Sequence, residues 1–461
     1  MLLVKRNPSL AFMGGHHAFP GGGVSRHDTG ARVLDAPDHE TARSLVAAVR
    51  EAFEETGLLL VEGALPDRER IETARHDLTV GKRDFESLLD AWQLHIRAAD
   101  FKAAGHWITP SFSPMRFDTR YYLYRCDQRR PATPMGPEGE ITAVDWLPPR
   151  EALRLRAHGS MLLSTPVAFT LQRLAAFPLD TALARLQHTP GFSPILMDYI
   201  EPVPGVHIVP VHAKTLPPAT HTNCIIIGER ELAIVDPGVS EEEEQRRLMT
   251  HLDDMLETVN GKLTHILLTH NHPDHCAHAE VLSRHYAIPV CAHPMSLDGF
   301  SNSRAIADDA WVILPGDPPW RIRCLHTPGH HPGHVCYYEE HTGALLCGDI
   351  AANPGTIMVD VASGGDMNAY LDSLERLSAL SPIMTVPGHG APLPGSEGTL
   401  LFQKTIAHRH MREAKIIAAL EQGATTMDAL LARAYDDTPR ELLPYAQRQL
   451  AAHLKRLGKD L

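Results

Sequence analysis

Hydrophobic and polar residues alternate with two different periods along the chain. Between Gly191 and about Pro394, short aliphatic runs of strand length alternate with longer segments that carry helix signals, which predicts a sheet covered by helices. After Gly395 the pattern is helical throughout. We expect three helices there, over 405–420, 426–435 and 442–457, with Gly423 closing the first and Thr425 or Thr426 capping the second.

Prolines separate this region from the N-terminal part of the chain. The segment from Pro178 to Pro210 contains Pro190, Pro194, Pro202 and Pro204 among polar residues, so it cannot stay helical and is expected to join two domains. We therefore predict an N-terminal domain over 1–185, a linker over 186–205, a second domain over 206–400 and a small helical domain over 401–461.

Composition and charge narrow the class of protein. With 461 residues and 43% hydrophobic content, the chain is long enough for two or three cores. It has no apolar run near 18 residues and no signal-peptide pattern, so we expect no membrane span. The seven cysteines are scattered, which is typical of reduced thiols in a cytoplasmic protein. The net charge of −13 works against nonspecific binding of polyanions.

The segment 269–275, Thr-His-Asn-His-Pro-Asp-His, holds the strongest chemical signal. It follows the apolar run 263–268, which predicts a buried strand that ends where the histidines begin. A lone histidine is usually structural, but three imidazoles and a carboxylate within six residues indicate metal ligands. In extended chain, His270 and His272 point the same way and can share one metal, while Asp274 and His275 reach a second after the turn.

Three later residues stand where predicted strands meet loops, namely His334, Asp349 and His389. Together these motifs resemble the metallo-β-lactamase superfamily, whose HxHxDH motif is matched in full. The resemblance implies an αββα sandwich with two zinc ions. It places His270, His272 and His334 on one zinc, and Asp274, His275 and His389 on the other. It also implies a bridging Asp349, a catalytic role for Asp274, an orienting Asp236, and supporting or surface roles for His326, His330 and His331.

Two zinc ions about 3.5–4 Å apart can lower the pKa of a shared water from about 15.7 to about 7. That chemistry suits hydrolysis of esters, thioesters, lactams or phosphodiesters. A structural zinc site would instead be closed by four ligands, usually cysteines, which seven ligands dominated by histidine and aspartate do not fit.

A second motif, 50–58, reads Arg-Glu-Ala-Phe-Glu-Glu-Thr-Gly-Leu. On a helix, Glu51, Glu54 and Glu55 gather on one patch beside Arg50, and Mg²⁺ or Mn²⁺ would relieve their repulsion and bridge to a diphosphate. The alternative is a solvated acidic helix face. With the preceding 19–23, Phe-Pro-Gly-Gly-Gly, the motif resembles the Nudix superfamily and its box REUXEEXGU, where U is a bulky aliphatic, which implies an α/β/α sandwich.

The box departs from the Nudix pattern at several positions. Its glycine and first glutamate fall on Ala36 and Ala42, so 24–36 looks like an insertion, and Ala52 replaces a larger aliphatic. Segments 107–110, 116–122 and 139–148 resemble the coenzyme A diphosphatase branch, which makes Glu140 or Glu138 a candidate carboxylate for activating water. The first Nudix strand is expected to begin upstream of Met1.

The helical tail resembles a winged-helix domain found on some metallo-β-lactamase proteins, including an endoribonuclease; His408, Arg409, Arg412 and Glu413 match its opening helix. From Lys404 onward ten Lys/Arg stand against seven Asp/Glu, too small an excess to indicate nucleic-acid binding. We expect a structural role or a homodimer contact.

We therefore predict a bifunctional, cytoplasmic hydrolase of small molecules with no membrane partner. The zinc domain would cleave a small ester or thioester, and the Nudix domain would cleave a nucleoside diphosphate-linked compound such as coenzyme A or an acyl derivative. The alternative is an endoribonuclease of single-stranded RNA whose Nudix half is a non-catalytic ligand sensor.

Overall fold

The computed structural model describes residues 1–10, 13–108, 117–126, 132–134, 139–187 and 199–459. These residues form two compact units, Met1–Ile195 and Leu196–Leu461, and the boundary falls inside the predicted linker 186–205. Four residues of the expected Nudix segments lie outside the described residues: Thr109, Pro110, Arg116 and Glu138. Within the described residues, no helix is long and apolar enough to cross a membrane.

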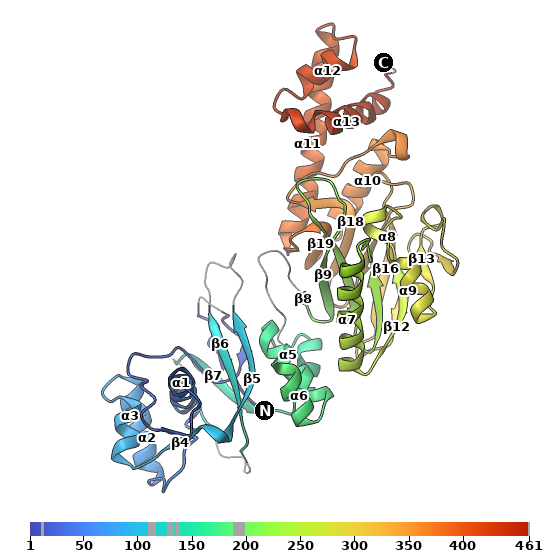
Figure 1. The fold of residues 1–461 in the computed structure, drawn as a ribbon. Coiled ribbons are helices and arrows are strands. Elements are labelled where there is room, and N and C mark those ends of the chain that lie inside the picture. The colour runs from blue at the N-terminus through green and yellow to red at the C-terminus, as the bar shows by residue number, and fades with distance from the viewer. Residues whose placement is uncertain (11–12, 109–116, 127–131, 135–138, 188–198, 460–461) are drawn as a thin grey trace. The chain divides into compact units, whose positions relative to one another are not determined.

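The first unit combines short sheets with helices (Figure 1). Its three-stranded sheet has the order β2-β1-β7, and two further pairs are β3-β4 and β5-β6. The strands are β1 (Leu2–Arg6), β2 (His17–Ala18), β3 (Val33–Leu34), β4 (Ile96–Arg97), β5 (Phe101–Ile108), β6 (Asp118–Tyr124) and β7 (Ile141–Trp146). The helices are α1 (His39–Thr56), α2 (Arg68–Thr79), α3 (Phe85–Ala91), the 3₁₀ turn η1 (Ala98–Asp100), α4 (Pro149–Ala157), α5 (Thr165–Ala176) and α6 (Leu179–Leu186).

Helix α1 carries the acidic motif and is fixed at both ends. The Asp38 side chain accepts a hydrogen bond from the Thr41 backbone N–H and caps the helix, and Gly57 ends it in the left-handed conformation with φ 76°. Leu45, Val49 and Phe53, four residues apart, are buried and pack with residues of α2 and α3 in one core. The opposite face of α1 is thereby left for the glutamates.

The second unit is a sandwich of two sheets. The first sheet contains, in sheet order, β14 (Ser303–Ala305), β13 (Val290–Ala292), β12 (Lys262–Leu267), β11 (Glu231–Val235), β10 (His221–Gly228), β9 (Val206–His212) and β8 (Ile200–Val203). The second contains β15 (Trp311–Leu314), β16 (Trp320–His326), β17 (Val335–Glu339), β18 (Ala344–Asn353), β19 (Met384–Gly390) and β20 (Leu393–Pro394). The predicted strand at 263–268 is therefore confirmed as β12.

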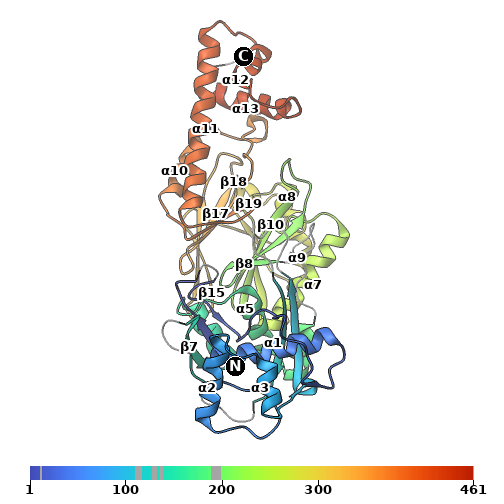
Figure 2. The ribbon, with the colours of Figure 1, turned by 90° about the vertical axis from the view of Figure 1, so that its left-hand side faces the viewer.

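Helices cover both outer faces of this sandwich (Figure 2). They are α7 (Glu242–Val259), α8 (Pro273–Cys276) and α9 (Ala279–Tyr286) with the first sheet, and α10 (Met367–Ser378) with the second; short 3₁₀ turns are η2 (Pro294–Ser296) and η3 (Val361–Ser363). Side-chain alternation explains the layers, because Leu346 lies between the sheets while its neighbour Leu345 faces α10. The predicted αββα sandwich is confirmed.

The tail consists of α11 (Ser396–Glu421), α12 (Met427–Ala434), the 3₁₀ turn η4 (Arg440–Leu442) and α13 (Leu443–Arg456). All three predicted helices are present, and Thr426 caps α12 as expected. Helix α11 begins before the predicted start because its first turns pack on the sheet: a Cβ at Gly398 would lie 2.0 Å from the Thr385 hydroxyl oxygen. Residues 395–459 contain no strand.

Candidate functional site

Strand ends of the first sheet deliver the first cluster of polar side chains. Strand β12 ends at Leu267, the next residues include His270 and His272, and α8 begins at Pro273. Asp236 follows β11 at the same edge of the sheet, and its carboxylate accepts hydrogen bonds from the Thr269 backbone N–H and hydroxyl, both at 2.7 Å. These bonds fix the loop that presents the histidines.

One group of ligand atoms consists of three imidazole nitrogens. His272 Nδ1 lies 2.9 Å from His270 Nε2 and 3.0 Å from His330 Nε2. The rings of His270 and His330 are buried, with 0% and 8% exposure. Three nitrogens that converge in this way form a metal-ligand set of His270, His272 and His330.

A second group lies beside the first and contains Asp274, His275 and His389, and a third group joins His270, His275 and Asp349. Asp349 Oδ1 lies 3.3 Å from both His275 Nε2 and His389 Nε2, and Asp274 Oδ2 lies 3.7 Å from His389 Nε2. The other oxygen of Asp349, Oδ2, lies 3.6 Å from His330 Nε2 in the first group. Asp349 thus faces both groups, the arrangement that a bridging carboxylate requires.

The structure corrects the predicted ligand set at one position, since His330 rather than His334 completes the first group. His334 is fully buried and both of its ring nitrogens are engaged: Nδ1 lies 2.9 Å from the Thr327 hydroxyl, and Nε2 accepts a hydrogen bond from the Asp349 backbone N–H at 3.1 Å. His334 therefore holds Asp349 in place. Both histidines belong to the same 328–334 turn, so spacing alone did not distinguish them.

A second expectation, that Asp349 ends its strand, is also wrong. Strand β18 continues to Asn353, and its pairing with β19 shifts register around Gly348, which has φ 45°. A side chain at Gly348 would lie 2.7 Å from His334 Nε2, so only glycine fits there. This irregularity aims Asp349 into the site from within the strand.

Further hydrogen bonds orient the remaining histidines. His275 Nδ1 lies 2.8 Å from Asp236 Oδ2, and His389 Nδ1 lies 2.9 Å from the His221 carbonyl. Each contact leaves Nε2 of that ring directed at Asp349. The role predicted for Asp236, orienting the site, agrees with this geometry.

Burial and neighbouring charges separate the pKa values of the two groups. Burial lowers the pKa of His270 well below its usual value and that of His272 to about 4, and nearby imidazoles add to the effect. Burial opposes protonation of His275 too, but the carboxylates of Asp349 and Asp236 hold its pKa well above the usual value. Burial opposes ionisation of Asp349, but the neighbouring His275 and His389 hold its pKa well below the usual value.

The donor set fits two transition-metal ions. His275 Nε2 and Asp349 Oδ1 are buried and make no hydrogen bond of good geometry, although they face each other. A cation between them would satisfy both atoms. Imidazole and carboxylate ligands suit zinc, iron or manganese, and the residues therefore fit the metals implied by the sequence.

In the first unit, Arg50 organises the acidic helix face. Its guanidinium donates to Glu51 Oε1 at 2.8 Å and lies 3.5 Å from Glu54 Oε1. On its other side it makes two 3.1 Å hydrogen bonds, one to each carboxylate oxygen of Asp28. Asp28 is 2% exposed and comes from the inserted segment, outside the residues that the motif predicted for the site.

The turn that carries Asp28 packs on Ala42, the position where the Nudix box usually has its first glutamate. A Cβ at Gly30, which has φ +84°, would lie 2.6 Å from the Ala42 Cβ, so the inserted turn packs directly on this alanine. The small residue makes room for the turn, and the turn brings Asp28 to Arg50. The sequence offers only a weak signal for Asp28, because position 42 is alanine and the inserted segment 24–36 contains two acidic residues, Asp28 and Asp35.

Glu55 occupies the most enclosed position of the acidic group. The Gly21 backbone N–H donates to Glu55 Oε2 at 3.0 Å, and a Cβ at Gly22 would overlap the Glu51 carboxyl group. Burial raises the pKa of Glu55 to about 8, and the charges of Glu51 and Glu140 act in the same direction. Carboxylates held in this way suit Mg²⁺ or Mn²⁺. Among the described residues, however, the carboxylate oxygens of this group lie farther apart than the ligand atoms of the histidine site.

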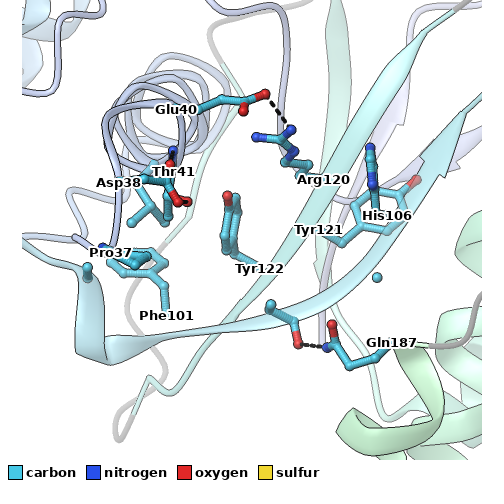
Figure 3. Close-up of a pocket in the computed structure, with 14 residues that line it drawn as sticks. Pro37, Asp38, Glu40, Thr41, Phe101, His106, Arg120, Tyr121, Tyr122 and Gln187 are labelled. Atoms are coloured by element: carbon cyan, nitrogen blue, oxygen red, sulfur yellow. Dashed lines mark hydrogen bonds and ion pairs between the residues drawn. The ribbon is translucent and has the colours of Figure 1, made fainter.

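A cavity of about 430 Å³ lies elsewhere in the first unit, between the N-terminal half of α1 and the β5-β6 hairpin (Figure 3). Phe101, Tyr121 and Tyr122 contribute aromatic surface. Its lining includes the Arg120–Glu40 ion pair, 2.5 Å apart, and Asp38, whose carboxylate caps α1. None of the helix glutamates Glu51, Glu54 and Glu55 lines it, so it is separate from the acidic site.

Family comparisons match three segments of the chain. Residues 217–389 match the metallo-beta-lactamase superfamily, residues 36–174 match the NUDT19 Nudix domain, and residues 426–460 match the beta-lactamase associated winged helix domain. The first match includes all residues of both ligand groups, and the second includes the whole of the acidic helix α1.

Several curated proteins are similar to this chain. A beta-lactamase-like protein 2 homolog from Drosophila melanogaster is 27% identical over 260 residues, which cover 52% of this chain and 82% of that protein. An atrochrysone carboxyl ACP thioesterase from Claviceps purpurea is 27% identical over 227 residues, 48% of this chain and 68% of the relative. The hydroxyacylglutathione hydrolase GloC from Haemophilus influenzae is 27% identical over 208 residues, 41% of this chain and 91% of the relative.

Proposed function

We propose that this multidomain hydrolase, which combines a Nudix domain, a metallo-β-lactamase domain and a winged-helix domain, cleaves small thioesters or esters at its histidine site. The observation that carries the proposal is the position of Asp349, whose two oxygens face separate groups of imidazole nitrogens. That geometry is what a dinuclear hydrolytic centre requires.

We assign each side chain of this centre a role in metal binding or proton transfer. His270, His272 and His330 would hold one ion, Asp274, His275 and His389 the other, and Asp349 would contact both. When bound, a pair of zinc ions supplies a nucleophile from water at neutral pH and polarises the bond being cleaved. Asp274 is in addition proposed to accept and return protons during turnover, because it is the most exposed carboxylate of the group, with 16% of its side chain accessible against 10% for Asp349.

Thioester chemistry has specific support. Two of the relatives are named as a thioesterase and as a hydroxyacylglutathione hydrolase. A thioester also needs no extended binding track, in agreement with the net charge of −13.

For the first domain we propose Mg²⁺- or Mn²⁺-dependent hydrolysis of a diphosphate linked to a nucleoside, such as coenzyme A or an acyl derivative. The Glu51, Glu54 and Glu55 carboxylates would hold the metal, and Glu140 would help to activate water. The support is the Nudix match together with the buried Asp28–Arg50 pair, which preserves the organisation of the acidic helix despite the altered box.

The structure of the tail argues against RNA cleavage. Several of its cations are engaged within the protein: Arg412 pairs with Asp437, Lys415 with Asp436, and Arg456 with Glu413. Basic side chains used in this way neutralise few phosphates. We propose a structural role for the tail and cytoplasmic action on small molecules. Sedimentation tests whether the chain also self-associates through the tail.

The test is a substrate panel on the full chain with matched variants. We expect turnover of acyl-glutathione or acyl-coenzyme A thioesters, little turnover of single-stranded RNA at physiological salt, and close to two transition-metal ions per chain. His272→Ala should abolish the thioesterase activity and leave diphosphate hydrolysis unchanged. Preference for RNA would overturn the substrate assignment, and absence of bound transition metal in protein prepared without chelator would overturn the dinuclear site.

A further inference from the structure

One backbone carbonyl fixes His330, the ligand that the sequence did not distinguish. His330 Nδ1 lies 2.7 Å from the Met358 carbonyl oxygen, which can only accept, so Nδ1 carries the proton. The lone pair of Nε2 then faces His272 Nδ1 at 3.0 Å and Asp349 Oδ2 at 3.6 Å. The position of this carbonyl therefore sets both the tautomer and the direction of the ligand nitrogen.

The segment that supplies the carbonyl, residues 356–359, has no regular secondary structure and is held by the helical tail. Arg409 of α11 donates to the Thr356 hydroxyl at 2.8 Å and to the Ile357 carbonyl at 2.5 Å. Gln449 of α13 accepts a hydrogen bond from the Val359 backbone N–H at 2.9 Å. The tail thus binds the residues on either side of Met358.

Packing makes this attachment rigid. Arg409 and Gln449 are 2% and 6% exposed. The side chains of Ile357 and Val359 are buried in a core that also contains Phe402 and Ala452 of the tail. Ile357 and Val359 are two residues apart and both pack in this core, while the intervening Met358 carbonyl reaches His330.

We propose that Arg409 and Gln449 are positioning residues for the metal centre, acting on His330 through residues 356–359. The tail is then an integral part of the hydrolase site rather than an appended recognition domain. This inference rests on the proposed dinuclear function, because it concerns the metal group that contains His330. Loss of either contact frees the Met358 carbonyl to move, and His330 loses its fixed orientation.

Arg409→Met and Gln449→Met remove the contacts and keep much of the side-chain volume. Arg412→Met is the matched control, because Arg412 is also a buried arginine of α11, 7% exposed, but it binds the Ala434 carbonyl within the tail. Metal retention is measured on each full-length protein by titration with a chelator, and the Co²⁺-substituted proteins are compared by absorption spectroscopy. Thermal unfolding establishes that each variant is folded.

We expect Arg409→Met and Gln449→Met to release one of two ions about 10–100-fold more readily than the unmodified protein, with a changed Co²⁺ spectrum. Arg412→Met should lower thermal stability without changing either readout. If the methionine variant at Arg409 or at Gln449 does not fold, the variant at the other residue still tests the positioning role. Unchanged metal affinity in a folded Arg409 or Gln449 variant overturns this inference alone. Failure of the unmodified protein to bind two ions overturns the dinuclear proposal and this inference with it.

Discussion

Removing the carboxylate of Asp28 tests whether the insertion completes the acidic site. Asp28→Ala deletes both hydrogen bonds to Arg50 and the bond that Asp28 Oδ2 accepts from the Ser25 backbone N–H at 2.6 Å. Arg50 keeps Glu51, Glu54 and the Gly23 carbonyl as partners. The guanidinium therefore remains charged and shifts its attraction toward the two glutamates.

The magnitude follows from burial. Asp28 and Arg50 have side chains that are 2% and 13% exposed, and breaking a buried ion pair costs about 3–5 kcal/mol. Because Arg50 retains other acidic partners, we expect the lower end, about 3 kcal/mol, as the loss in local stability of α1. Arg50 then competes more strongly with a metal ion for the Glu51 and Glu54 carboxylates. If this competition costs the metal 1.4 kcal/mol of binding free energy, Mg²⁺ or Mn²⁺ binds about tenfold more weakly.

Both effects can be measured on the full chain. Hydrogen exchange of the α1 amides reports the local stability, and Mn²⁺ titration followed by electron paramagnetic resonance reports the affinity. Asp38→Ala is the control, since it removes the α1 cap bond to Thr41 at 2.7 Å and should cost about 1 kcal/mol without changing Mn²⁺ affinity. The reasoning is refuted if Asp28→Ala matches this control in stability and binds Mn²⁺ as tightly as the unmodified protein.

Three further predictions concern other parts of the molecule. His330→Ala should remove one metal ion and lower thioesterase activity by about 10²-fold or more. His334→Ala should weaken metal binding only about tenfold, because His334 supports Asp349 and is not itself a ligand. Elemental analysis and kinetics distinguish the two variants. Glu55→Gln should lower diphosphate hydrolysis by about 10²-fold and leave thioester hydrolysis unchanged, and loss of both activities would contradict independent sites. Burial lowers the pKa of His453 to about 4. Between pH 4 and the usual pKa of histidine, His453 is therefore protonated in the unfolded chain and neutral in the folded chain. Stability of the tail should therefore fall by up to about 3 kcal/mol on acidification through that window, and thermal unfolding of His453→Gln should not show this loss.

Sequence reasoning was most successful where local pattern and chemistry coincide. The 269–275 cluster could be predicted as a candidate metal site because its histidines and aspartate lie close together in the sequence. The apolar run before it predicted β12. The tail helices followed from periodicity and from the Thr426 cap. The proline-rich segment 178–210 contains the boundary between the two compact units, but it also contains α6, β8 and the start of β9, so its prolines did not exclude regular structure.

Local pattern did not distinguish His330 from His334, because both occupy one glycine-rich turn. Only the folded chain decides that the Met358 carbonyl lies beside His330 while Thr327 and the Asp349 backbone take both nitrogens of His334. The contacts that select the ligand come from residues far apart in the chain.

Asp28 shows the same limit in the first domain. The sequence by itself determined that the box glutamates are present on an amphipathic helix and that its first acidic position is alanine at Ala42. Which carboxylate of the inserted segment pairs with Arg50 depends on how that turn packs, and the close contact between Gly30 and Ala42 is a property of the tertiary structure. Short-range periodicity fixes which elements form and which residue types they carry. Long-range packing decides which of several similar side chains reaches the site. That choice depends on contacts between segments far apart in the sequence, and the sequence does not show how close such segments lie in the folded chain.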